Sequence, residues 1–202
     1  MILIACALAA ELRGWLQRPG TQLLETGVGP VEAGIVTART LAEKPYSAVL
    51  SAGIGGAFPG RGHVGEALVV AEERLADLGR EDGERLALPD GAVPLDRAFS
   101  SDELLARIDR LPYRIGTGIT VHRVTCSETT VTRLLDAYHA DVESMEGYAV
   151  LRASRCAGVP ALEIRGISNY VGPRTASQWN FAAGAQACVA ALDAVLDRLG
   201  VA

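Results

Sequence analysis

The run from Ile2 to Ala7 is continuously apolar, which predicts a strand covered on both faces, as in a sheet packed between layers of helices. A second apolar run, Pro160 to Ile167, reads in the same way. Further strands are expected at 21–26, 46–52, 64–71, 113–124 and 140–144, and helices at 9–17, 31–41, 129–138, 145–156 and 177–199. This alternation predicts an α/β fold, a single domain over residues 1–202 with a mixed central sheet flanked by helices.

The composition fits such a domain and excludes some functions. A chain of 202 residues is long enough for a proper core, and 49% hydrophobic with 21% charged residues indicates a globular rather than a disordered chain. The net charge of −5 argues against nucleic acid or an anionic membrane as a partner.

The cellular location is also constrained. Glu11 and Arg13 follow the first apolar run at once and no basic segment precedes it, so it reads as a buried strand rather than a signal peptide. No run reaches transmembrane length. The four cysteines lack metal-ligand spacing and read as free, buried thiols of a reducing compartment. We therefore expect a cytoplasmic protein.

Polar or glycine-rich clusters follow several of the predicted strands. They are Gly27 to Gly29, Gly53 to Gly56, Glu143 to Glu146, and Ser168 with Asn169, and Glu11 follows the first strand. Because parallel strands end at one edge of an α/β sheet, where such folds hold ligands, we expect these clusters to converge.

The glycine clusters favour close backbone approach to an anion or a sugar. Gly27-Val-Gly-Pro30 and Gly53-Ile-Gly-Gly56 match neither a Walker loop nor the complete dinucleotide fingerprint G-x-G-x-x-G. The alternative is that both are ordinary tight turns between a strand and a helix.

Each candidate side chain also has a functional and a purely structural interpretation. Glu146 and Glu143 lie where a strand leads into a helix, so either they cap the helix or an ionised carboxylate there accepts hydrogen bonds from a sugar diol. Glu11 is either a solvated glutamate of a first helical turn or a general base in a partly dry cleft. Asn169 either shapes a turn or presents an amide to a ligand.

The segment from Glu72 to Phe99 is charged, rich in Gly and Pro, and weakly patterned. We expect a long excursion from the compact domain, and excursions of this length are often functional.

Taken together, the clusters resemble the nucleosidase branch of the nucleoside phosphorylase superfamily, and within it most closely the futalosine hydrolases. The matching segments span most of the chain in the family's order: Ala7-Leu-Ala-Ala-Glu11, Thr26-Gly-Val-Gly29, Ser51-Ala-Gly-Ile-Gly-Gly56, Val142-Glu-Ser-Met-Glu-Gly147 and Ile164-Arg-Gly-Ile-Ser-Asn169. The Met-Glu pair and the late Ser-Asn pair are the specific signals, whereas the glycine turns are weak ones.

The resemblance implies roles for individual residues. Glu11 would activate water, Glu146 would hold the ribose 2′- and 3′-hydroxyls, and Met145 would pack against the sugar. Asn169, supported by Ser168, would face N7 and the 6-substituent of the purine. The remaining substrate contacts implied are Gly53 and Ile54 in the glycine cluster and Trp179 in an apolar lid over the 5′ substituent.

Two departures from relatives bear on the reaction. Nucleosidases for methylthioadenosine and S-adenosylhomocysteine carry Asp where this chain has Asn169, and phosphorylases carry arginines that both glycine clusters lack, although Arg61 is near the second one. The implied reaction is hydrolysis of futalosine to hypoxanthine and dehypoxanthine futalosine in menaquinone biosynthesis, without a metal or redox cofactor.

The alternatives are a methylthioadenosine/S-adenosylhomocysteine nucleosidase, a purine nucleoside phosphorylase, and a nucleoside-binding protein without catalytic activity. In each case a small purine nucleoside is the expected partner. The resemblance also implies a homodimer or a higher homo-oligomer.

Overall fold

The computed structural model describes residues 1–80, 86–173 and 179–201. In chain order the strands are β1 (Ile2–Cys6), β2 (Thr21–Glu25), β3 (Ala48–Ala57), β4 (Ala67–Leu75), β5 (Arg97–Phe99), β6 (Arg114–Thr120), β7 (Val142–Ser144) and β8 (Ala161–Tyr170). The helices are the 3-10 helix η1 (Ala9–Leu12), α1 (Pro30–Glu43), α2 (Asp102–Arg107), α3 (Glu128–Tyr138), α4 (Gly147–Cys156) and α5 (Phe181–Leu199).

All eight strands belong to one mixed sheet, in the order β2-β1-β3-β7-β6-β4-β5, and β8 pairs with both β3 and β4. The pairings β3–β7, β7–β6, β6–β4, β4–β8 and β8–β3 therefore close a ring of five strands. The predicted α/β architecture, a mixed sheet flanked by helices, is confirmed, and the ring is a feature that the sequence pattern does not reveal.

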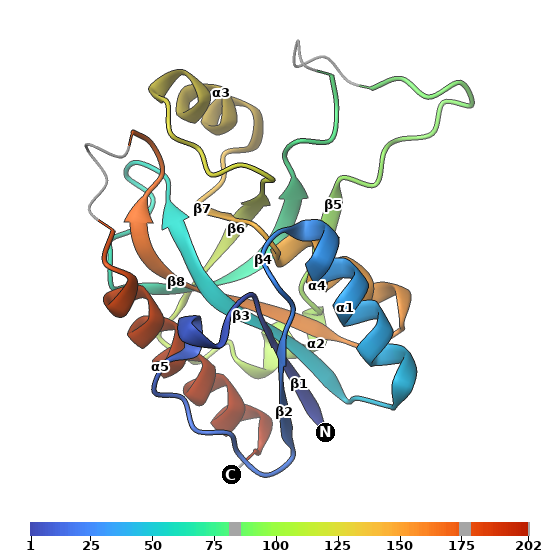
Figure 1. Cartoon of the computed structure of the whole chain (residues 1–202), viewed down its shortest axis with the longest axis vertical. Helices are drawn as coiled ribbons and strands as arrows, with labels where there is room; N and C mark the ends of the chain where they lie inside the picture. The colour runs from blue at the N-terminus through green and yellow to red at the C-terminus, as the bar shows by residue number, and fades with distance from the viewer. Residues whose placement is uncertain (81–85, 174–178, 202) are drawn as a thin grey trace.

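Helices cover the sheet on opposite sides, with α5 on one side and the pair α1 and α4 on the other (Figure 1). β1 shows why its sequence is continuously apolar. Ile2 and Ile4 pack into the core under α5, whereas Leu3 and Ala5 alternate into the core under α4. Among the described helices, none is long and apolar enough to cross a membrane.

Several predicted boundaries shift. The helix expected at 9–17 is only the short η1, and the helix expected from Ser177 begins at Phe181, with 174–178 outside the described residues. The excursion contributes its two ends to the sheet, because β4 continues to Leu75 and β5 pairs with it from Arg97. The cysteine prediction is partly wrong, since Cys126 and Cys156 are exposed.

Two of the clusters lie inside strands rather than after them. β3 continues through Gly53–Gly56 to Ala57, and β8 continues through Ser168 and Asn169 to Tyr170. β3 and β8 pair in parallel along nearly their whole length, so the two clusters lie side by side. Backbone hydrogen bonding with a neighbouring strand offsets the low strand propensity of the glycines.

Candidate active site

Glu11 reaches across the sheet edge to the glycine cluster of β3. Its Oε2 accepts a hydrogen bond of 3.0 Å from the backbone N–H of Ile54, and the side chain is only 7% exposed. Gly53 must lack a side chain here, because a Cβ would collide with Glu11 Oε2 and with Arg165 Nη1. The interpretation of Glu11 as a solvated residue of a helical turn is therefore wrong.

Glu146 is held from the other glycine cluster. Its Oε1 accepts a hydrogen bond of 2.8 Å from the N–H of Gly29, whose φ of 95° lies in the region that favours glycine. The first N–H groups of α4 are instead satisfied by Ser144 Oγ, 3.3 Å from Gly147 N, and by Thr120 Oγ1, 2.8 Å from Tyr148 N. The side chain of Glu146 therefore does not cap the helix.

Arg165, which was not among the predicted site residues, lies between these two carboxylates. It is 2% exposed, its Nη2 donates to Ser51 Oγ at 3.3 Å, and its Nη1 packs against Gly53 beside Glu11. Burial disfavours its charged form, but Glu163, Glu146 and Glu11 together hold its pKa above the usual value. A cation in an otherwise apolar strand, two residues from an anion, is the sequence signal that would have found it.

Arg165 is itself held by a second layer of acids. Its Nε donates to Glu163 Oε1 at 2.7 Å, and Glu163 is in hydrogen-bonding contact with Glu73. Both glutamates are fully buried. Burial first, and then the charge of Glu163, raises the pKa of Glu73 well above its usual value, so that Glu73 is the protonated partner.

Burial sets the protonation of the two site carboxylates as well. It raises the pKa of Glu11 to about 7, against the opposing effects of Arg165 and the Ile54 N–H. Burial likewise raises the pKa of Glu146, again opposed by Arg165 and by the Gly29 N–H. A carboxylate with a pKa near neutrality is suited to exchange protons during a reaction.

The end of β8 presents Asn169 in a fixed orientation. Ser168 Oγ donates to Asn169 Oδ1 at 2.8 Å, and Asn169 Nδ2 donates to the Tyr170 carbonyl at 3.0 Å. One N–H and one lone pair of the amide are left for a ligand. Gly56 makes room for it, since a Cβ there would lie 2.9 Å from Asn169 Nδ2.

The positions of the remaining predicted site residues relative to these carboxylates are less closely defined. Ile54 and Met145 are half-buried, and Met145 packs beside the cluster that contains Ile119 and Val171. Trp179 is 49% exposed and precedes α5, next to Asn180, whose N–H bonds to the Ser168 carbonyl at 2.7 Å. Residues 174–178, shortly before Trp179, lie outside the described residues, and the role of Trp179 in a lid stays a prediction.

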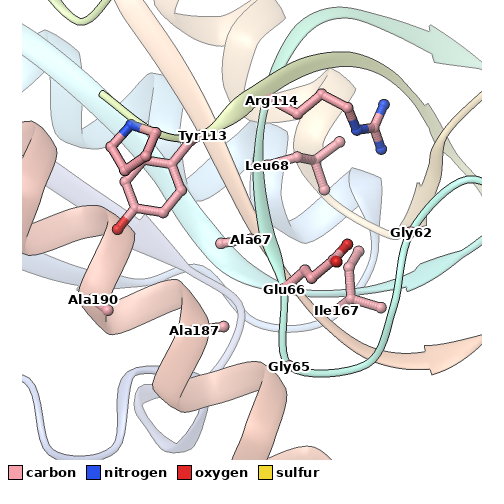
Figure 2. A pocket seen from close by; sticks show the side chains of 11 residues that line it. Gly62, Gly65, Glu66, Ala67, Leu68, Tyr113, Arg114, Ile167, Ala187 and Ala190 are labelled. Carbon is pink, nitrogen blue, oxygen red and sulfur yellow. The ribbon is translucent and has the colours of Figure 1, made fainter. Parts of the chain in front are cut away.

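Two hollows lie away from this constellation. One, of about 500 Å³, lies between α5 and the starts of β4 and β6 and is lined by Tyr113, Arg114 and Glu66 among others (Figure 2). Its charged side chains already have partners, because Arg114 pairs with Asp141 at 2.8 Å and Glu66 accepts from the N–H of His63 at 2.9 Å. The other, of about 790 Å³, is lined by residues of β5, α2 and α4.

Comparison with known protein families assigns this fold, with its paired acids around a buried arginine, to a class of proteins. The model of the phosphorylase superfamily matches residues 12–199, and the chain belongs to this superfamily.

Curated proteins that are similar to this chain include futalosine hydrolases. The chain is 36% identical over 190 residues to a futalosine hydrolase of Streptomyces coelicolor, covering 87% of this chain and 77% of that protein. It is 34% identical over 174 residues to a futalosine hydrolase of Thermus thermophilus, with coverage of 81% and 76%.

A solved structure shows the same fold. It is a 5′-methylthioadenosine/S-adenosylhomocysteine nucleosidase of Neisseria meningitidis in complex with methylthio-immucillin-A, with a TM-score of 0.78, 16% identity, and coverage of 96% of this chain and 97% of that one.

Proposed function

We propose that this protein hydrolyses the N-glycosidic bond of futalosine and releases hypoxanthine and dehypoxanthine futalosine, a step of menaquinone biosynthesis. The observation that carries the proposal is the buried pair Glu11 and Glu146 on either side of Arg165, with a pKa of about 7 at Glu11. The two curated futalosine hydrolases support the choice of substrate. The reaction takes place in the cytoplasm.

In the proposed mechanism the C1′–N9 bond breaks first and leaves an oxocarbenium-like sugar. Glu146 accepts hydrogen bonds from the 2′- and 3′-hydroxyls, and its charge favours the cationic sugar. Glu11, as the carboxylate, takes a proton from water while the water oxygen bonds to C1′. The N–H groups of Ile54 and Gly29 orient the two carboxylates, and the charge of Arg165 lowers the pKa of each.

The leaving base must not depart as an anion. An amide cannot supply a proton, so in this scheme a second water protonates N7 of the leaving hypoxanthine, and the proton that Glu11 took from the attacking water neutralises the hydroxide left behind. Asn169 then stabilises the neutral base, with its free N–H directed to O6 and the free lone pair of Oδ1 directed to N7–H. Ser168 favours this orientation because its hydroxyl donates to Oδ1.

Water fits the site better than phosphate as the attacking group. The Gly29 N–H, which an anion would need, is already bound to Glu146, and the cation Arg165 is surrounded by carboxylates. Arg61 is exposed, beyond the end of β3. A phosphorylase would need a positively charged anion site that these contacts do not provide.

Chromatography of products tests the proposal. The protein would be incubated with futalosine, inosine and methylthioadenosine, each with and without inorganic phosphate. We expect hypoxanthine and dehypoxanthine futalosine from futalosine, at a rate that does not depend on phosphate. Products that carry a sugar phosphate would establish a phosphorylase, faster release of adenine would establish the methylthioadenosine activity, and binding without turnover would establish a binding protein.

A further inference from the structure

Glu146 lies at the position from which a side chain ordinarily caps a helix. It is the residue just before α4, and a side chain there normally accepts a hydrogen bond from the backbone N–H of the second or third helical residue, here Tyr148 or Ala149. The partial positive charge at the start of a helix strengthens this preference when the side chain is an ionised carboxylate. The Glu146 carboxylate is nevertheless bound to the N–H of Gly29, just before α1.

Two buried hydroxyls occupy the N–H groups at the start of α4. Thr120 Oγ1 accepts a hydrogen bond from the N–H of Tyr148 at 2.8 Å, and Ser144 Oγ accepts one from the N–H of Gly147 at 3.3 Å. Neither hydroxyl belongs to the helix, because Thr120 ends β6 and Ser144 ends β7. The first two N–H groups of α4 are therefore capped by the ends of two strands instead of by Glu146.

The buried acid pair fixes the direction of the hydrogen bond at Thr120. The Thr120 hydroxyl donates to Glu73 Oε2 at 2.9 Å, so that only its lone pairs face the N–H of Tyr148. Glu73 is in turn in hydrogen-bonding contact with Glu163. The helix starts directly against this pair, since a Cβ on Gly147 would collide with both carboxylate oxygens of Glu163. The Thr120 hydroxyl is thus held as an acceptor for the helix.

We propose that Thr120 and Ser144 are positioning residues, whose hydroxyls keep Glu146 from capping α4 and leave its carboxylate free for the hydroxyls of a ribose. The inference rests on the proposed nucleoside hydrolysis, in which Glu146 accepts hydrogen bonds from the sugar. Without the Thr120 hydroxyl, the N–H of Tyr148 would be buried without an acceptor, which is costly. An ionised Glu146 would relieve that cost by turning to Tyr148, and it would then be lost to the sugar.

Discrimination between ribose and 2′-deoxyribose tests this role. Wild type should have a kcat/KM for futalosine about tenfold or more above that for its 2′-deoxy analogue, as expected for a hydrogen bond to a carboxylate. In Thr120→Val, which keeps the shape but lacks the hydroxyl, this ratio should fall at least about fivefold, whereas Thr120→Ser should retain it. Thr37→Val is the matched control, because the Thr37 hydroxyl is also buried but has no hydrogen-bond partner among the described residues.

A purely structural role for these hydroxyls predicts a different result. It would lower kcat/KM for both substrates alike, so an unchanged ratio in folded Thr120→Val would overturn the inference. Wild type that does not distinguish ribose from 2′-deoxyribose would overturn it as well. Ser144→Ala should also lower the ratio, and if Thr120→Val does not fold, an unchanged ratio in Ser144→Ala would overturn the inference in its place.

The proposed function fails in a different way. If wild type cleaves methylthioadenosine instead of futalosine, or needs phosphate, the proposed function is refuted, and the same ratio for the nucleoside that is cleaved decides the role of Thr120. If wild type binds these nucleosides without cleaving them, the ratio of the two affinities, measured by calorimetry, replaces the ratio of kcat/KM values.

Discussion

Burial and polar contacts shift the pKa of the Glu11 carboxylate in opposite directions. Burial raises its pKa to about 7, and the Arg165 charge and the Ile54 N–H limit the rise. The ionised form is the base, so kcat/KM for futalosine should rise with pH through about 7 and level off above it.

Glu11→Gln should lower kcat by about 10²- to 10⁴-fold and leave nucleoside binding largely intact, as steady-state kinetics and calorimetry would show. Turnover at the wild-type rate would reduce Glu11 to a structural residue.

The same shift predicts how stability depends on pH. The pKa of Glu11 in the folded state lies above its ordinary value of 4.5, so its contribution to stability is present below about 4.5 and is lost as pH rises through about 7. Glu11→Gln should therefore raise the free energy of unfolding at pH 8, by up to about 3 kcal/mol, and have little effect at pH 4. Urea denaturation at both pH values would measure this, with exposed Glu43→Gln as the control. An equal effect at both pH values would contradict the assignment.

The role of Glu146 can be tested by changing the substrate as well as the protein. Glu146→Ala should weaken riboside binding and turnover together, because each hydrogen bond from a hydroxyl to a carboxylate contributes about 1.5–3 kcal/mol. Removing the 2′-hydroxyl from the substrate should cost wild type more than the variant. A double-mutant cycle of this kind measures the contact, and equal losses in both proteins would exclude it.

At the scale of elements, the sequence predicts the strands and helices well but not how the functional clusters are built into them. Hydrophobic periodicity identifies β1, α1 and α3 nearly to their ends. Gly53 to Gly56 reads as a turn because glycine is a poor strand former, yet β8 pairs with this segment and keeps it extended. The sequence did predict that the clusters converge, because ligand-binding residues of such folds gather at strand ends. The contacts of Glu11 with Ile54 and of Glu146 with Gly29 agree with this expectation.

The second layer of the site was not predictable in this way. Arg165 and Glu163 are two residues apart on one strand, so their pairing has a local signal. Glu73 belongs to β4, in the part of the chain that reads as an irregular excursion, and it reaches Glu163 only because β4 and β8 pair. Such a contact depends on long-range strand pairing, which local patterns do not encode.

This buried acid pair predicts different outcomes for two otherwise identical substitutions. Glu73→Gln should retain stability and kcat/KM, because glutamine is neutral like the protonated acid and can still donate to Glu163. Glu163→Gln removes the anion 2.7 Å from Arg165 and should cost about 3–5 kcal/mol of stability, with a fall in kcat/KM. Chemical denaturation and kinetics of both variants would check this. The opposite ranking would place the charge on Glu73 instead.

On the scale of the whole molecule, apolar side chains are exposed on the segment 86–96 and on α1. Residues 86–96 reach away from the sheet beyond β5, and on this arm Val93 is 70% exposed and Leu95 64% exposed (Figure 1). Val31 and Ile35 on α1, in the helix that follows Gly29, are 61% and 58% exposed. Exposed apolar side chains that form a continuous patch are typical of surfaces that a partner covers.

We therefore expect a homodimer whose interface includes the arm between β4 and β5. A stable interface buries about 800 Å² per subunit, and loss of apolar contacts at its centre typically dissociates it. Val93→Asp with Leu95→Asp should convert the protein to a monomer at micromolar concentration in light scattering. Leu16→Asp is the matched control, since Leu16 is 81% exposed on the loop between η1 and β2 and should leave assembly unchanged. Wild type that is monomeric and fully active would refute the dimer, and a dimer that survives the arm substitutions would place its interface elsewhere.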